Sequence, residues 1–446
     1  MQQRAQRQGN AARQLRHLLI ANRRGKGLGV YSICSAHPRV LEAGMLQAVR
    51  DRSLLLIEST SNQVNQFGGY TGQTPADFAR FVRETARTMR FPRERIVLGG
   101  DHLGPHVWRN EPAAPAMEKA CEMVRAYVQA GFTKIHLDAS MPCAGDQVER
   151  DGQLSGEIVS ARAAELCQAA EEAYRRLPRG ANAPVYVIGN EVPVPGGGHS
   201  GKIALKVTRT SDLQCTLRMT KEAFKARGLQ SAWERVIAVV VQPGVEFGDA
   251  TVVAYDSWKA RRLSQFVTEN WSGVFEAHST DYQTRPALRQ MVKDHFAILK
   301  VGPALTFALR EAVFALEAIE REWLCGRSGV SLSGVKEALE RAMLESPSHW
   351  KSYYEGDEAA LRFARKYSYS DRARYYWPKA EVSRAFGQLV ANLNAYPAPL
   401  ALLRQFLPVQ ANAVRDGELA NRPEDLIRHK ILGALDPYAY ACGERS

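Results

Sequence analysis

Eight short apolar runs recur along residues 29–306, and a stretch with helical periodicity follows each of them. The runs are Gly29–Cys34, Leu54–Thr60, Ile96–Leu103, Phe132–Ser140, Val185–Pro193, Val236–Gly244, Val274–Tyr282 and Ile298–Thr306. Most are continuously apolar, as expected of parallel strands that are covered on both faces. Helical patterns such as Pro75–Met89, Ala116–Ala130 and Ile158–Arg176 lie between them. Eight alternations of strand and helix predict an α/β fold, a closed (β/α)8 TIM barrel.

The residues capable of chemistry come at the end of almost every run. They are Glu58, Asp101 with His102, Asp138, Glu191, Gln242, Glu276 with His278, and Lys300. Barrels of this type build their active sites at the carboxyl ends of the strands. An open doubly wound sheet is the rival architecture, but no GxGxxG turn follows the first run. The sequence therefore predicts an enzyme with its site at one mouth of a barrel.

The pattern of the chain changes after about residue 325. Residues 1–24 are expected to be a tail that leads into a first helix, residues 25–325 the barrel, and residues 326–446 a helical C-terminal extension. The helices expected there are Ser331–Leu344, Ala359–Tyr367, Glu381–Asn392 and Leu400–Arg415. The segment Tyr367–Pro378 (YSYSDRARYYWP) is the most distinctive part of this extension.

The 446 residues carry a net charge of +12, which raises nucleic acid as a partner. Because Lys and Arg are spread along the whole chain, we expect no nucleic-acid partner; an anionic substrate or a merely basic, soluble surface explains the charge. No stretch of 18 apolar residues exists, so no membrane association is expected. Seven cysteines without CxxC spacing suit a reducing cytoplasm. A homo-oligomer remains open.

Three strand ends carry candidate ligands for a divalent metal: His102, Glu191 and His278. Three N/O ligands and an open position describe a catalytic site that polarises a carbonyl. Taken alone, the Asp101-His102 pair is more simply read as a helix-capping Asp beside a hydrogen-bonded His. Glu191 could equally accept a hydrogen bond from a substrate hydroxyl, and His136, which lies mid-strand, is expected in the core.

Two loops suit ligand recognition. Asn62 and Gln63 follow the second run and precede the glycines of Gly68–Thr71, which suits binding of sugar hydroxyls or phosphate. The stretch Gly196–Ile203 (GGGHSGKI) nearly matches a phosphate loop, but Ile203 replaces the metal-holding Ser/Thr. We expect a mobile Gly-rich lid there, which removes the support for a kinase.

Long segments of the chain resemble the tagatose-bisphosphate aldolase Z-subunit family. They are Cys34–Pro38 (CSAHP), Ile57–Gly72, Gly99–Pro105 (GGDHLGP), Lys134–Ser140 (KIHLDAS), Glu191–Gly197, Val240–Phe247, Glu276–Arg285 (EAHSTDYQTR), His295–Ala312 and Arg374–Pro378 (RYYWP). The resemblance runs from about residue 29 to the C-terminus. It implies a fold related to class II aldolases, which are metal-dependent barrels.

The resemblance also implies a function in galactitol-type sugar catabolism. Some members are similar to 4-epimerases that interconvert tagatose 6-phosphate and fructose 6-phosphate; others are non-catalytic subunits that support a class II tagatose-1,6-bisphosphate aldolase. The polar strand ends favour the epimerase, with a phosphorylated ketohexose as substrate and zinc as the first metal to expect, before Mn, Co, Ni or Mg.

An epimerase of this kind needs groups that move protons and groups that hold phosphate. Asp101, with Asp138 or Glu58, is predicted to transfer the protons. Phosphate is expected after the seventh and eighth strands, its usual position in this fold. The residues there are Ser279, Thr280, Lys300 and Gly302.

Overall fold

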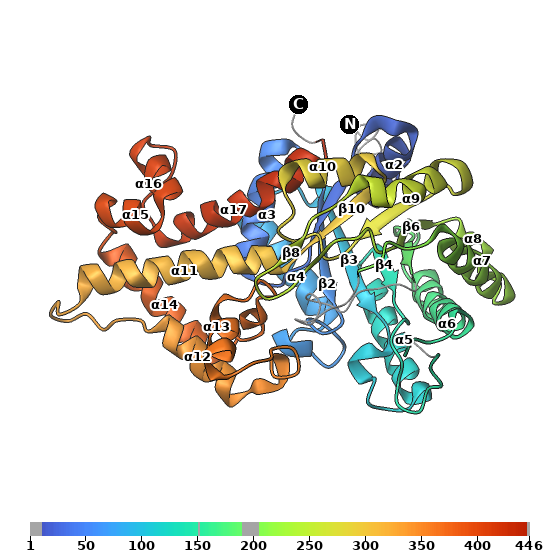
Figure 1. Ribbon diagram of the computed structural model, residues 1–446, viewed down its shortest axis with the longest axis horizontal. Helices are drawn as coiled ribbons and strands as arrows, with labels where there is room; N and C mark the ends of the chain where they lie inside the picture. The colour runs from blue at the N-terminus through green and yellow to red at the C-terminus, as the bar shows by residue number, and fades with distance from the viewer. Residues whose placement is uncertain (1–10, 150–151, 190–204, 444–446) are drawn as a thin grey trace.

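The computed structural model of the chain describes residues 11–149, 152–189 and 205–443. Eight parallel strands form a closed barrel in the order β1-β10-β9-β6-β5-β4-β3-β2 (Figure 1). They are β1 (Val30–Ile33), β2 (Leu55–Thr60), β3 (Ile96–Leu103), β4 (Lys134–Leu137), β5 (Val185–Ile188), β6 (Val236–Val240), β9 (Val274–Ala277) and β10 (Phe296–Val301). The predicted (β/α)8 barrel is confirmed, and every predicted run contains or overlaps one strand.

Most strands end before the runs do. β4 stops at Leu137, so Asp138, which follows it, lies on a loop at the mouth, and β5 stops at Ile188. A small antiparallel hairpin of β7 (Glu246–Phe247) and β8 (Val252–Val253) stands after β6 and was not foreseen.

The helices around the strands follow the predicted alternation. They are α2 (Ala11–Ala21), α3 (Pro38–Asp51), α4 (Pro75–Thr88), α5 (Ala113–Ala130), α6 (Gly156–Arg175), α7 (Thr210–Ala226), α8 (Gln230–Trp233), α9 (Ser257–Asn270), α10 (Arg285–Lys293) and α11 (Pro303–Leu324). Thr74 begins α4 with a reciprocal capping box, since its hydroxyl accepts from Asp77 N and the Asp77 carboxylate accepts from Thr74 N.

The amino-terminal end of the barrel interior is apolar and closed. Leu15 and Leu19 of α2 are buried against interior residues such as Leu56 and Ile298. Arg16 of the same helix donates a hydrogen bond to the carbonyl oxygen of Glu234 at 3.2 Å, just before β6. Helix α2 therefore plugs the end of the barrel opposite the polar strand ends.

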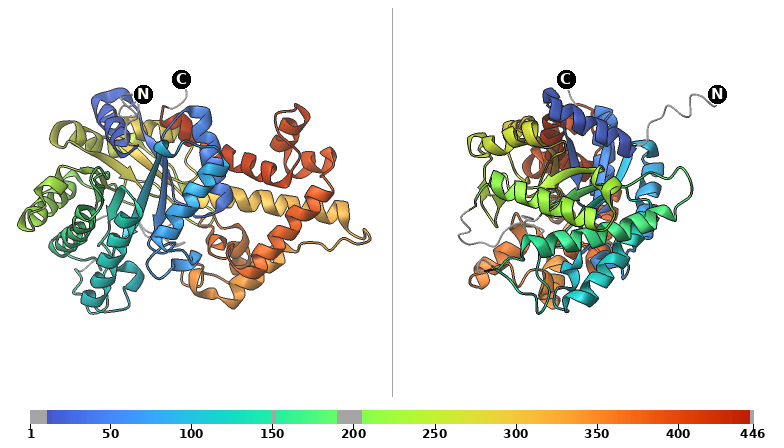
Figure 2. Two further views of the ribbon diagram at one scale, coloured as in Figure 1. Left: turned by 180° about the vertical axis from the view of Figure 1, so that it is seen from behind. Right: turned by 90° about the vertical axis from the view of Figure 1, so that its right-hand side faces the viewer.

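The C-terminal extension leaves the barrel along α11 and comes back to it. Its elements are α12 (Val335–Glu345), α13 (Glu358–Tyr367), the 3-10 helix η6 (Arg372–Tyr375), α14 (Ala380–Ala395), α15 (Leu400–Phe406), α16 (Pro408–Arg415) and α17 (Pro423–Ala441). Figures 1 and 2 show α11 projecting from the barrel and α17 running back beside it. The division of the chain at residue 325 stays a prediction.

The last helix, α17, was not predicted, and it packs on the barrel. It lies against α3, α10 and α11. Its Tyr438 hydroxyl donates to the carbonyl oxygen of Thr280 at 2.8 Å, and the carbonyl of Cys442 accepts from Gly29 N at 3.1 Å. Among the described residues, no helix is both long and apolar enough to cross a membrane.

Candidate active site

A network of buried charges fills the carboxyl end of the barrel interior. Lys134 Nζ contacts Glu58 Oε1 and lies 2.7 Å from Glu276 Oε2. Lys300 Nζ contacts Glu58 Oε2 and lies 2.9 Å from Asp101 Oδ1. All five side chains are 6% exposed or less. The three carboxylates and two ammonium groups are therefore stabilised by one another and not by water.

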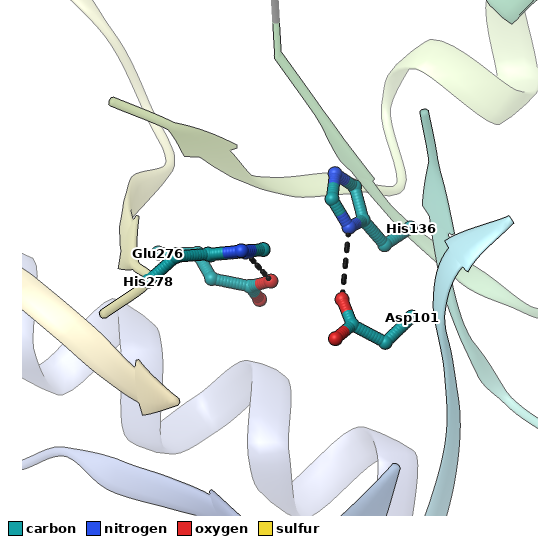
Figure 3. A group of neighbouring side chains, drawn as sticks. All are labelled: Asp101, His136, Glu276 and His278. Atoms are coloured by element: carbon teal, nitrogen blue, oxygen red, sulfur yellow. Dashed lines mark hydrogen bonds and ion pairs between the residues drawn. The ribbon is translucent and has the colours of Figure 1, made fainter. Parts of the chain in front are cut away.

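Three histidines lie beside this network, and each has its own carboxylate partner. The pairs are His102 with Asp138 (Nδ1–Oδ2, 2.7 Å), His136 with Asp101 (Nδ1–Oδ1, 3.0 Å) and His278 with Glu276 (Nε2–Oε1, 3.1 Å). Figure 3 shows the second and third pairs approaching from opposite sides. Carboxylates that hydrogen-bond imidazoles in this way fix their tautomer and orientation.

The backbone at the strand ends brings these groups together. Neighbouring residues on a strand point to opposite faces, but His102 has a left-handed φ of 48° at the end of β3. Asp101 and His102 consequently line the same cavity. Gly104 lets the chain pass β4 closely, since a Cβ there would lie 1.5 Å from the Asp138 carbonyl oxygen.

Burial and charge shift the pKa values of the site in opposite directions. Burial lowers the pKa of His102, but the charge of Asp101 and the hydrogen bond to Asp138 outweigh it and raise this pKa to about 9. Burial lowers the pKa of His278, and the hydrogen bond that it donates to Glu276 offsets this only in part. Burial also lowers the pKa of Lys300 to about 8. Opposed shifts in one cleft are a mark of functional sites.

Two overlapping donor sets could hold a divalent metal, one of two carboxylates with two imidazoles and one of three imidazoles. Asp101, His136, Glu276 and His278 each offer a ligand atom within 4.8 Å of the other three. The ring centroids of His102, His136 and His278 lie 4.9, 5.2 and 5.4 Å apart. Zinc–nitrogen bonds of ~2.0–2.1 Å place three bound imidazole centroids about 5 Å apart.

The charges of the cluster point to the same conclusion as its geometry. Four carboxylates, those of Glu58, Asp101, Asp138 and Glu276, face two lysines, Lys134 and Lys300. With His102 protonated, as its raised pKa implies, one negative charge remains uncompensated within the cluster; with all three histidines neutral, as metal ligands must be, two negative charges remain. A divalent cation would balance them, and buried charges that lack a counter-ion are costly.

A cavity opens at this end of the barrel, and the extension helps to build it. Its lining residues are Cys34, Thr60, Asn62, Gln63, Tyr70, Asp101, His102, Phe247, His278, Ser279, Asp281, Lys300, Val301, Gly302, Pro303, Arg374 and Tyr375. Arg374 and Tyr375 belong to η6, so the mouth is completed by a segment more than 70 residues beyond β10.

The predicted site residues fall into four groups. Those that line the cavity are Asn62, Gln63, Asp101, His102, His278, Ser279, Lys300 and Gly302. Glu58 and Asp138 lie behind it, paired with Lys300 and His102. Thr280 is fully buried and donates to the carbonyl oxygen of Lys300 at 2.6 Å. Glu191 and the expected lid at Gly196–Ile203 lie outside the described residues.

Sequence reasoning missed several residues of the cluster. His136 was expected in the core; it is buried, but in the polar layer and hydrogen-bonded to Asp101. The signal was the alternation of Lys134, His136 and Asp138, which places the first two on the interior face of β4 and carries Asp138 to the same side just past its end. Glu276 and His278 alternate in the same way. No comparable pattern marked Asp281, Arg374 or Tyr375.

Comparisons with known proteins agree with this fold. A family model described as D-tagatose-1,6-bisphosphate aldolase subunit GatZ/KbaZ-like matches residues 15–443. A crystal structure of a probable tagatose 6-phosphate kinase from Sinorhizobium meliloti 1021 is 45% identical, with a TM-score of 0.83; the match covers 93% of this chain and 100% of that one.

Two aldolase structures are more distant. Fructose-bisphosphate aldolase from Campylobacter jejuni is 14% identical, with a TM-score of 0.48, over 86% of this chain and 93% of that chain. The YdjI aldolase from Escherichia coli K12 is 10% identical, with a TM-score of 0.40, over 84% and 96%. Both are too distant to carry an argument about chemistry.

Proposed function

Since the chain belongs to the GatZ/KbaZ-like family of D-tagatose-1,6-bisphosphate aldolase subunits, we propose that it is a metal-dependent ketose-phosphate 4-epimerase. Its substrates would be D-tagatose 6-phosphate and D-fructose 6-phosphate. The observation that carries the proposal is the group of three carboxylate-backed histidines beside a buried charge network at the barrel mouth. A subunit that only stabilises a partner has no chemical need for such a cluster.

Epimerisation at C4 of a ketohexose cannot begin at the C4–H bond, which is not acidic. Removal of the C4 hydroxyl proton instead allows the C3–C4 bond to break. The bond electrons move onto the C1–C3 fragment as an enediolate, and C4 becomes an aldehyde. When the aldehyde turns its other face and the bond re-forms, the proton returns to the C4 oxygen and the configuration is inverted.

The imidazoles of His102, His136 and His278 would hold the metal. The carboxylates of Asp138, Asp101 and Glu276 would orient them, as outer carboxylates do in histidine metal sites. A divalent ion held there supplies Lewis-acid polarisation of the substrate carbonyl. Zinc suits an imidazole set best, although Mn, Co and Ni also bind imidazole.

Asp101 is the residue best placed to move the proton. It is the carboxylate of the cluster that lines the cavity, and the charges around it, above all His102, outweigh burial and hold its pKa well below the usual range. Lys300 Nζ, 2.9 Å from Asp101 Oδ1, is a donor that stabilises the ionised carboxylate. Glu58 also contacts Lys300 Nζ.

The direct test is to incubate the purified chain alone with D-tagatose 6-phosphate and a divalent metal. Formation of D-fructose 6-phosphate, followed by 13C NMR, is expected with the wild type and not after removal of the metal with a chelator. Metal content is measured on the same samples. Addition of ATP should leave the product unchanged, and formation of a bisphosphate would favour a kinase instead.

The family description itself favours a second function, that of a subunit of a class II tagatose-1,6-bisphosphate aldolase. On that alternative the wild type would be inactive alone on any ketohexose phosphate. It would instead raise the activity or the lifetime of a separate aldolase. Mixing the chain with a class II aldolase, and comparing the rate of bisphosphate cleavage with and without it, distinguishes the two.

A further inference from the structure

The usual phosphate position of this fold is already occupied by the chain itself. Barrels of this type often bind phosphate at backbone N–H groups after the eighth strand, at a helix N-terminus. Here Asp281 Oδ1 accepts from Gly302 N at 3.0 Å and from Ala304 N at 2.8 Å. Both donors at the start of α11 are thus used by a buried carboxylate. A phosphate bound there would face that carboxylate at close range, and the two charges would repel.

An arginine from the C-terminal extension lines the same cavity. Arg374 Nη1 donates to the carbonyl oxygens of Ser370 and, at 3.0 Å, Asp371, while Nη2 donates to the Tyr375 hydroxyl at 3.0 Å. Among the described residues no carboxylate lies within 4.0 Å of its guanidinium. The Asp371 carboxylate is instead paired with Arg310, Nε to Oδ1 at 2.7 Å. Arg374 therefore brings to the cavity a positive charge that has no ion-pair partner among the described residues; Asp281 and Asp371 act on it only at longer range.

The segment that carries Arg374 is held on the barrel by several contacts. Tyr369 N donates to the carbonyl oxygen of Asp249 at 2.8 Å, on the loop that contains β7 and β8. The Tyr282 hydroxyl donates to the carbonyl oxygen of Tyr369 at 2.6 Å, and the two rings stack with centroids 4.3 Å apart. Because Asp249 and Tyr282 both follow barrel strands, the guanidinium is positioned before any ligand arrives.

We propose that Arg374 binds the phosphate group of the sugar substrate, so that the C-terminal extension and not the N-terminus of α11 confers specificity for phosphorylated ketoses. This inference rests on the proposed function for the identity of the substrate. A guanidinium matches phosphate oxygens with paired N–H donors. Ser279, which lines the cavity with a left-handed φ of 53°, offers a further hydroxyl.

The test measures binding without turnover. D-Glucitol 6-phosphate lacks the ketone and cannot undergo the cleavage, so its affinity is measured by calorimetry beside those of D-glucitol and inorganic phosphate. Arg374→Met is expected to bind D-glucitol 6-phosphate about 10–100-fold more weakly, the loss expected for charged hydrogen bonds. Binding of D-glucitol should not change. The matched control is Arg384→Met, which removes an exposed arginine of α14 and should bind all three probes as the wild type does.

A second variant keeps the test sharp if Arg374→Met does not fold. Arg374→Lys retains the charge but not the paired donors, and should bind D-glucitol 6-phosphate more weakly than the wild type and more tightly than Arg374→Met. Wild-type affinity in a folded Arg374→Met protein would overturn the inference. If the chain has epimerase activity but Arg374→Met binds D-glucitol 6-phosphate as tightly as the wild type, only this inference is contradicted. Arg374-dependent binding of D-glucitol 6-phosphate by a chain without epimerase activity supports this inference and contradicts only the proposed reaction.

Discussion

The two ends of the barrel interior differ although the same strands build both. At the amino-terminal end, Leu56, Val274 and Ile298 pack with α2 in a closed apolar cluster. Two residues further along the same strands stand Glu58, Glu276 and Lys300, which form the buried charge network. Residues two apart share a face of a strand, so one step along the interior changes an apolar layer into a charged one. We infer that the first layer provides stability and the second provides chemistry, at a cost in stability.

The largest effect should come from the charged end. Asp101→Asn removes the proposed proton acceptor while nearly preserving its shape, so turnover should fall by ~10²–10⁴-fold. Because Asp101 also orients His136, turnover is measured at saturating metal, where metal content should match the wild type; thermal stability should stay close to it. Rate measurements on D-tagatose 6-phosphate, together with melting curves, test this. If Asp101→Asn unfolds more easily but the folded molecules keep wild-type turnover, the charged layer is structural, like the apolar layer.

The apolar end should respond in the opposite way. Leu15 is fully buried in the plug formed by α2, and Leu15→Ala should reduce the free energy of unfolding by about 2–5 kcal/mol because it leaves a cavity. Turnover per folded molecule should not change. Denaturant unfolding measures the first quantity and titrated activity the second. Leu332→Ala, at a 38% exposed position, is the control and should change stability by less than about 0.5 kcal/mol.

Asp281 should give the next largest effect, and one that depends on pH. Burial raises the pKa of this carboxyl to about 6 although two backbone N–H groups donate to it. In the unfolded chain the pKa of an Asp carboxyl is about 3.9. Because the folded pKa is higher, the native state keeps this proton to a higher pH than the unfolded state does. The carboxyl therefore lowers the free energy of unfolding as pH rises from about 4 to 6. Asp281→Asn removes this dependence. Relative to the wild type, the variant should gain on the order of 2–3 kcal/mol between pH 4 and pH 7.5. If the difference in unfolding free energy between the variant and the wild type is the same at both pH values, the raised pKa does not belong to Asp281.

The smallest effect concerns the groups behind the metal ligands. Asp138 accepts from His102 Nδ1 and does not line the cavity. Asp138→Asn should weaken metal affinity about 10–100-fold, as loss of an outer carboxylate does. Competition with a chelator of known affinity measures this, and Asp146→Asn, which alters a carboxylate paired with Arg162, is the control. If both variants bind the metal with equal affinity, Asp138 does not support the metal site.

The difference between the two ends also explains which parts of the fold and of the site could be predicted from the sequence. Apolar runs that end in polar residues, such as Leu54–Thr60, predict both a strand and the position of the barrel mouth. The apolar part predicts the strand, because a barrel strand is buried on both faces. The polar end predicts the mouth, because the loops that follow the strands carry the functional residues. The alternation of Lys134, His136 and Asp138 carried more information, since it identifies an interior face. Arg374 could not be placed from local pattern, because its position depends on contacts to Asp249 and Tyr282, far away in sequence. Glu191 remains a prediction.

The return of α17 to the barrel has a consequence for biosynthesis. A nascent chain that has emerged as far as Leu324 contains all eight strands, but the faces of α3, α10 and α11 that α17 covers are still bare. Roughly 100 more residues must be translated before Ile427, Ile431 and Leu435 can cover them, a delay of about 5–20 s at ribosomal speed. The surface that α17 covers is therefore buried only at the end of synthesis, after all eight strands have been translated.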